Sequence, residues 1–202
     1  TFAADYGIKP YVLSKELIEI RELANLQHLE INRLRSLKNH KDAISTKNAA
    51  KELERQIKQA EKTIDRFQEK INSLIQLVPE LLEKKKLLCS VKGIGEKIAT
   101  TLIVFLPELG SCNRRQIASL CGLAPFNNES GTYRGHRYIK GGRSRVRTAL
   151  FMAALVSIRC NDRYSSMYRK IVHEEHRPAK VALIAIARKL VCYLNSLMKR
   201  AG

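Results

Sequence analysis

Apolar residues recur at alternating spacings of four and three through one long segment in the first half of the chain. They are Leu53, Ile57, Ala60, Ile64, Phe67, Ile71 and Leu74. Lys, Glu and Arg surround this stripe, a pattern typical of a helix that buries one narrow face against another helix. A looser stripe precedes it, at Leu13, Leu17, Ile20, Ala24, Gln27, Ile31 and Leu34. The two stripes predict two long helices.

The segment between the stripes, residues 39–48 (NHKDAISTKN), interrupts both and predicts a turn. Ser45 or Thr46 is suited to cap the second helix. Two arrangements fit these helices: a coiled-coil arm that joins protomers into a dimer or tetramer, or a helical hairpin within one chain. The regularity of the second stripe favours the first arrangement, so we predict a coiled-coil oligomerisation arm over residues 14–78.

Charge is distributed unevenly along the 202 residues, which carry a formal net charge of +18. Residues 1–84 contribute +2 of it and residues 85–202 contribute +16. This favours a polyanionic partner, either nucleic acid or an anionic membrane. The longest apolar runs, Ala149–Val156 and Val181–Ala187, are too short to span a bilayer, and no secretory signal is recognisable. We therefore expect a cytoplasmic protein that binds nucleic acid and no membrane.

The five cysteines show no C-x-x-C spacing, and most of them have apolar neighbours. We expect buried free thiols in a reducing compartment. His173 and His176 are spaced to share a helix face, but matching Cys or His partners are missing. No metal site is therefore expected in this chain.

Residues 87–106 (LLCSVKGIGEKIATTLIVFL) predict an apolar helix, a tight turn and a second helix that starts at Glu96. Gly93 and Gly95 permit a turn whose backbone N–H groups point outward at a helix N-terminus, a geometry that binds phosphate. Lys92 and Lys97 flank this turn. The pattern is that of a helix-hairpin-helix motif, which binds nucleic-acid backbones without sequence preference; a plain bend between helices is the alternative.

Four further helices are predicted from apolar residues at helical spacing, over Arg114–Cys121, Ser144–Cys160, Asp162–His173 and Ala179–Lys199. The last is apolar nearly all round and is expected to be buried. No strand is expected except a possible short hairpin in the loop at 129–147. The predicted fold is mainly α: a long helical coiled-coil arm, then a compact all-helical domain over residues 79–202 with the helix-hairpin-helix motif and a basic loop.

The basic loop, residues 129–147 (ESGTYRGHRYIKGGRSRVR), combines a serine in a turn-like setting with many cations. Phosphoryl transfer to a hydroxyl needs a positioned nucleophile and cations that neutralise the nonbridging oxygens. Ser130 precedes Gly131, which allows a sharp exposed turn. Arginines clamp phosphates and tyrosines stack on bases. The predicted nucleic-acid contacts in the loop are Tyr133, Arg134, Arg137, Lys140, Arg143, Arg145 and Arg147.

Several points in this loop stay open from the residues alone. Either Glu129 or His136 is suited to take the hydroxyl proton. A serine before glycine is also a common turn residue, so a loop that only contacts nucleic acid is the alternative. Three loop glycines, Gly135, Gly141 and Gly142, are expected to let the backbone approach a ligand. Ser111 and Ser144 are weaker nucleophile candidates, because both are expected to cap helices.

Three segments, in this order along the chain, resemble one family. They are VKGIGEKIATTLI (91–103), LPELGSCNRRQIASLCGLAPFNNESGTYRGHRYIKGGRSRVRTALFMAALV (106–156) and AKVALIAIARKLVCYLNSL (179–197). They resemble the C-terminal transposase domain of the insertion-sequence one-ten family, the bridge-RNA-guided recombinases related to the Piv and MooV invertases. The resemblance covers about Leu87 to Met198, and the predicted arm is similar in kind to the family's middle segment.

The resemblance implies DNA transposition or site-specific recombination through a covalent phosphoserine intermediate, with Ser130 as the serine of the family's SG motif. It implies DNA, a structured guide (bridge) RNA and further protomers as partners. It also implies that an acidic Mg²⁺ site lies on an N-terminal RuvC-like domain. Residues 1–13 are then expected to be the tail of that domain or a linker. This chain is expected to hold no cofactor and to be inactive alone. The alternative function is a non-catalytic DNA- or RNA-binding module.

Overall fold

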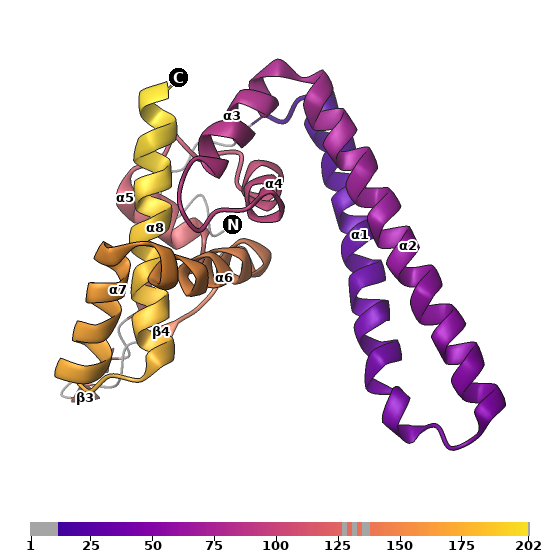
Figure 1. Cartoon of the computed structure of the whole chain (residues 1–202). Coiled ribbons are helices and arrows are strands. Elements are labelled where there is room, and N and C mark those ends of the chain that lie inside the picture. Colours follow the sequence, from indigo (N-terminus) through magenta and orange to yellow (C-terminus); the bar gives the residue numbers. More distant parts are fainter. Residues whose placement is uncertain (1–11, 127–128, 131–132, 135–137, 202) are drawn as a thin grey trace. The chain divides into compact units, whose positions relative to one another are not determined.

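The computed structural model describes residues 12–126, 129–130, 133–134 and 138–201, with the backbone alone for Phe126, Glu129, Ser130, Tyr133 and Arg134. Helices dominate this described part, which confirms the prediction of a mainly α protein. The chain divides into two compact units (Figure 1). One is Leu13–Leu82 and the other contains Glu83–Gly202. Each unit has its own core, so each is described by itself.

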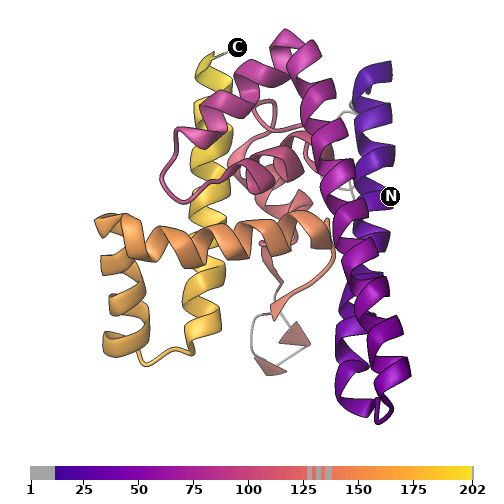
Figure 2. The same ribbon diagram turned by 45° about the vertical axis from the view of Figure 1, so that its right-hand side comes forward.

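The first unit is a hairpin of two long helices, α1 (Lys15–Asn39) and α2 (Lys47–Leu77) (Figures 1 and 2). A 3-10 turn at Lys41–Ala43 joins them inside the predicted turn segment. Thr46 occupies the N-cap position of α2, although its side chain makes no capping hydrogen bond. The two apolar stripes therefore pack against each other within one chain, as in the hairpin alternative.

The interface between α1 and α2 combines apolar side chains with one polar pair. The residues buried in the hairpin are Leu17, Ile20, Leu53, Ala60, Ile71 and Ile75. Gln27, a polar member of the first stripe, donates from Nε2 to Ile64 O at 3.2 Å and to Gln68 Oε1 at 3.1 Å. A polar residue inside an apolar seam favours one alignment of the two helices over shifted ones.

The second unit is a helical domain. It begins at Glu83, within α3 (Pro79–Cys89), and continues with α4 (Glu96–Phe105), α5 (Arg114–Leu120), α6 (Ser144–Cys160), α7 (Asp162–Arg169), a π-helical turn at Lys170–Glu174 and α8 (Ala179–Ala201). α8 packs against α5, α6 and α7, and α6 also packs against α4. Figure 2 shows α6 crossing α8. These bounds confirm the predicted helices to within a few residues.

α8 is the core helix of this domain. Its buried residues are Ala182, Leu183, Ile186, Ala187, Leu190, Val191, Leu194, Asn195 and Met198. Among the described residues it is long and apolar enough to cross a membrane by length and composition, but 50% of its apolar window is buried inside the protein. Because α8 packs against α5, α6 and α7, its apolar composition is that of a helix in the core of a domain.

Two short antiparallel strand pairs lie between α5 and α6 and form a β-ribbon. The outer pair joins β1 (Pro125–Phe126) to β4 (Tyr138–Ile139). The inner pair joins β2 (Glu129–Ser130) to β3 (Tyr133–Arg134). The short hairpin that the sequence allowed in the basic loop is therefore present.

Candidate functional site

Ser130 lies on the inner strand pair of the β-ribbon. Glu129 faces Arg134 in this pair, and Ser130 faces Tyr133. Ser130 is therefore the last residue of β2 and lies opposite the first residue of β3. One short hairpin therefore contains the backbone of the predicted nucleophile Ser130 and of the predicted contacts Tyr133 and Arg134. Their side chains lie outside the described part of the chain, and so does all of Arg137.

The root of the ribbon is closed by a backbone contact that we call the glycine crossing, made by Gly122, Gly141 and Gly142. All three glycines have positive φ angles, of 64°, 68° and 65°. A Cβ atom on Gly142 would collide with the backbone of Gly122. The Arg143 N–H also donates to Leu120 O at 2.8 Å. The freedom of Gly141 and Gly142, which we expected to serve a ligand, brings two segments of the protein's own backbone together instead.

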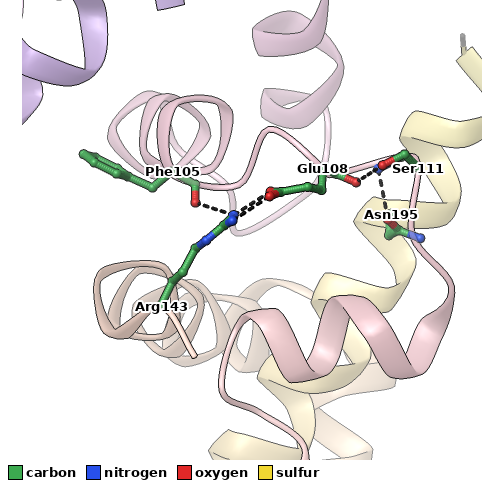
Figure 3. A network of polar contacts seen from close by, with 6 residues as sticks. Phe105, Glu108, Ser111, Arg143 and Asn195 are labelled. Carbon is green, nitrogen blue, oxygen red and sulfur yellow. Dashed lines mark hydrogen bonds and ion pairs between the residues drawn. The ribbon is translucent and has the colours of Figure 1, made fainter. Parts of the chain in front are cut away.

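Arg143, which is half-buried, forms a two-pronged ion pair with the buried Glu108 (Figure 3). Its Nη1 and Nη2 atoms each lie 2.5 Å from a carboxylate oxygen, and Nη1 also donates to Phe105 O at 3.0 Å. Glu108 is only 7% exposed. Hydrogen bonding to Glu108 raises the pKa of Arg143. In this structure the guanidinium joins the start of α6 to the loop after α4, so its donors serve the protein itself.

The next two predicted cations are also engaged within the domain. The guanidinium carbon of Arg145 lies 4.3 Å from the centre of the Phe105 ring, and burial lowers the pKa of Arg145. Arg147 donates from Nη1 to Gly141 O at 2.6 Å, which braces the glycine crossing. Lys140 is exposed at the end of β4. Among the predicted loop cations with described side chains, Lys140 is thus the most available to a partner.

Asn195 links this network to α8 (Figure 3). Its Oδ1 accepts from the Gly110 N–H at 2.9 Å, and its Nδ2 donates to Cys112 O at 2.7 Å. Ser111, between them, donates from Oγ to Glu108 O at 2.8 Å. The loop that carries Glu108 is therefore fixed to the core helix, which gives Arg143 a stationary partner.

The helix caps differ from those predicted. Asn113 caps α5 and forms a capping box with Gln116, and Arg143 holds the N-cap position of α6. Ser111 and Ser144 therefore occupy neither cap, so the prediction that both cap helices was wrong. Asn is among the preferred N-cap residues, and its side chain here accepts from two backbone N–H groups.

The predicted phosphate-binding turn packs tightly against α6. Gly93 has a φ of 97°, and a Cβ atom there would collide with Ser157 Oγ. Ser157 Oγ in turn donates to Lys92 O at 3.4 Å. The Lys92 and Lys97 side chains are exposed on either side, and Gly95 holds the N-cap position of α4 with open space beside it. A partner could therefore reach the turn.

The electrostatics of this turn are mixed. Glu96, the first residue of α4, forms an ion pair with Lys85 at 3.1 Å. A carboxylate in the first turn of a helix competes with a bound phosphate for the same N–H groups. The turn also lies near the opposite end of α6 from Arg143, about 20 Å away at 1.5 Å per residue. The two predicted sites are therefore separate surfaces.

Parts of the chain are similar to a family of transposases and to two gene-inverting proteins. Residues 85–169 match the IS116/IS110/IS902 family of transposases. The pilin gene-inverting proteins of Moraxella bovis and Moraxella lacunata are each 33% identical to the chain over 135 residues. That alignment covers 64% of this chain and 41% of each relative, so the chain spans about two fifths of the length of these curated relatives. The similarity to a transposase family and to gene-inverting proteins therefore covers part of this chain.

The segment that matches the transposase family contains the turn at Gly93, the Glu108–Arg143 pair and the whole β-ribbon. It ends before α8, where the structure reveals a set of surface residues that the sequence analysis missed. They recur at spacings of three and four along one side of α8, at Val181, Ile184, Arg188, Cys192 and Ser196. Such spacings mark one face of a helix, so the signal was present in the sequence but was outweighed by the helix's apolar composition.

Thiols and metal ligands play no visible part in this site. Cys112 and Cys121 are buried, Cys89 and Cys192 are half-buried, and Cys160 is exposed, so burial holds for only part of the set. All five are free, as expected. Within the described residues no cluster of three or more His, Cys, Asp or Glu side chains is suited to hold a metal ion. The residues present there do not fit the Mg²⁺ site that the resemblance implies for the N-terminal domain.

Proposed function

We propose that this chain supplies the serine-bearing domain of a DNA transposase or site-specific recombinase, with Ser130 as the nucleophile. The observation that carries the proposal is the family match over residues 85–169, within which Ser130 lies on the inner strand pair of the β-ribbon. The Glu108–Arg143 pair and the glycine crossing hold the root of that ribbon.

In the proposed reaction the Ser130 hydroxyl oxygen attacks a DNA phosphorus atom. A bond forms between serine oxygen and phosphorus, the bond from phosphorus to one deoxyribose oxygen breaks, and that oxygen leaves as a hydroxyl after taking a proton. Attack by a deoxyribose hydroxyl from another strand then forms the new phosphodiester and releases serine. Energy stored in the phosphoserine ester makes the exchange possible without another energy source. The base that takes the serine proton is Glu129 or His136, as the sequence allows.

The remaining parts of the proposal follow from the family resemblance. An acidic Mg²⁺ site on an RuvC-like domain, a guide RNA and several protomers would complete the reaction, and this chain alone would bind nucleic acid without cutting it. No step of the reaction is assigned to the metal, because the described residues contain no cluster of side chains suited to hold a metal ion. For association of protomers, the outer face of α1 is available, where Ile18, Leu26 and Leu29 are 42%, 48% and 64% exposed.

The test is a search for the covalent adduct. The natural gene product, with its RNA, donor and target DNA and Mg²⁺, is run on denaturing gels next to Ser130→Ala and the control Ser144→Ala. Ser144 is an exposed serine in the same basic segment. We expect an adduct and recombinant DNA from the wild type and from Ser144→Ala, and neither from Ser130→Ala. Recombination undiminished in Ser130→Ala would remove Ser130 as the nucleophile.

A non-catalytic nucleic-acid-binding module is the second candidate. It is favoured by one observation: the exposed Lys92 and Lys97 flank the open N-terminus of α4, a helix-hairpin-helix-like arrangement that needs no nucleophile. On this view Ser130→Ala leaves every activity unchanged. Lys92→Glu would weaken DNA binding and lower the salt dependence of the affinity. The adduct experiment therefore separates the two candidates.

A further inference from the structure

The helical domain carries an open groove that lies outside every site considered so far. α8 and α7 form its length, and residues of α5, α6 and the β1–β4 pair complete it. Its volume is about 1210 Å³. Figure 1 shows α7 and α8 side by side in this domain, with β4 near them. We call this surface the basic groove.

Positive charge lines the groove without any negative charge. Seven cations surround it: Arg114, Arg115, Arg163, Lys180, Arg188, Lys189 and Arg200. No Asp or Glu is among its lining residues, and none of the seven forms an ion pair with a carboxylate that the structure describes. Seven cations without a carboxylate among them make the potential of the groove positive, so the arrangement favours a polyanion as the partner.

The floor of the groove is apolar and aromatic. Phe151, Tyr164 and Met167 line it together with apolar residues of α8. Two tyrosines in it stay unusually open to solvent, Tyr138 at 47% and Tyr193 at 49% exposed. A double helix presents phosphates to a protein and hides its base faces, so it needs cations but no such floor. Unpaired bases have exposed faces that stack on aromatic rings.

We propose that the basic groove binds a single-stranded segment of DNA or RNA, with bases on Tyr138 and Tyr193 and phosphates along the cationic rim. From Lys180 to Arg200 the rim follows about 30 Å of helix at 1.5 Å per residue. That length suits sites of roughly 4–16 nucleotides. The inference rests on the proposed function only in taking nucleic acid as the partner.

The position of Tyr138 connects the groove to the candidate nucleophile. Tyr138 pairs with Phe126 in the outer strand pair, at the base of the ribbon whose inner pair carries Ser130. A strand held on Tyr138 and Tyr193 therefore runs from α8 to the foot of the ribbon. The groove therefore ends at the outer strand pair of the ribbon whose inner pair carries the residue proposed to cut and rejoin DNA.

The experiment measures binding of the full 202-residue chain to labelled oligonucleotides of about 12 nucleotides. Oligo-dT, oligo-U and a duplex of the same length are compared by fluorescence anisotropy over a range of salt. Tyr193→Ala should weaken single-strand binding between about 5-fold and 150-fold, because one stacked base is lost, and should leave duplex binding and the salt slope unchanged. Tyr193→Phe, which keeps the ring, should restore the affinity.

The cations are tested by a matched pair on the same helix. Arg188→Gln should lower the salt slope for single strands by about 0.7, whereas Lys199→Gln, exposed on α8 but outside the groove, should not. Whether dT or U binds more tightly distinguishes DNA from RNA as the source of the strand.

Two results overturn the groove proposal. One is unchanged single-strand affinity in both Tyr193→Ala and Arg188→Gln, with the wild type still binding duplex; the proposed function would then stand without the groove. The other is that an acidic amphipathic peptide binds at Tyr193 and an oligonucleotide does not, which would make the groove a protein-docking site. If the wild type binds no nucleic acid at all, both the groove proposal and the proposed function are contradicted.

Discussion

Arginine serves different purposes at different positions of this chain. Arg143 neutralises a buried carboxylate, Arg145 covers the Phe105 ring and Arg147 bonds to the backbone of the glycine crossing. In the sequence these three belong to one basic run and resemble a phosphate clamp. Their partners lie as far as 40 positions earlier in the chain, so the run alone cannot distinguish a structural arginine from a binding one.

Removal of Arg143 should act first on folding. Arg143→Ala leaves Glu108 buried without its counterion, and we expect a loss of about 2–4 kcal/mol in the free energy of unfolding, below the full range for buried pairs because the Arg143 side chain is 35% exposed. Urea denaturation measures this loss. The exposed control Lys140→Ala should stay within about 0.5 kcal/mol of the wild type. A stable Arg143→Ala protein with weakened DNA binding would contradict the structural role.

At the level of elements, helices were predictable where apolar periodicity is strong, and less so where tertiary contacts decide. The predicted bounds of α6, Ser144–Cys160, agree with the structure because its ends are marked by a basic loop and by Asn161. The predicted helix at Asp162–His173 instead changes to a π-helical turn after Arg169. The π-helical turn also contacts α8, and no local pattern in the sequence marks where the change occurs.

The pairing of α1 with α2 also limits how the hairpin can associate. Its stripes are already used within the chain, so a second copy would have to use the outer face of α1, where Ile18 and Leu29 lie about three turns apart. Leu29→Lys should then lower the sedimentation-derived mass towards that of a monomer while helical content is kept. Gln59→Lys, an exposed polar change on α2, serves as the control. An unchanged mass in Leu29→Lys would exclude this face as the contact between protomers.

At the scale of the whole molecule, the sequence predicted which half of the chain carries the positive charge but not on which surface this charge gathers. The basic groove draws its cations from α7, α8 and the distant α5, and these helices meet only when the domain packs. Ser130 could be singled out from its motif alone, whereas Tyr193 could not, because a tyrosine in an apolar helix is usually a core residue. Convergence in space is the information that a single sequence lacks.

Thiol reactivity offers a report on the integrity of the helical domain. The thiolate is the reactive form, and burial raises the pKa of the Cys121 thiol, so Cys121 should resist alkylation in mildly alkaline buffer even as exposed thiols react. Cys160, which is exposed, should be labelled first. Peptide mass spectrometry after brief iodoacetamide treatment measures both. Equal labelling of the two in native protein would contradict this packing, and denatured protein, in which all sites react, is the control.

The glycine crossing has a consequence for how such a protein can diversify. The chain leaves the helical domain at Gly122 and returns to it at Gly142, and the two points touch. The segment between them begins and ends at one point, so its length can change without altering the spacing of α5 and α6, whereas the buried Leu123 and the groove residue Tyr138 have to be kept. The part of this segment that carries Ser130 can therefore vary in length, provided that these two residues and the glycines at both ends are kept.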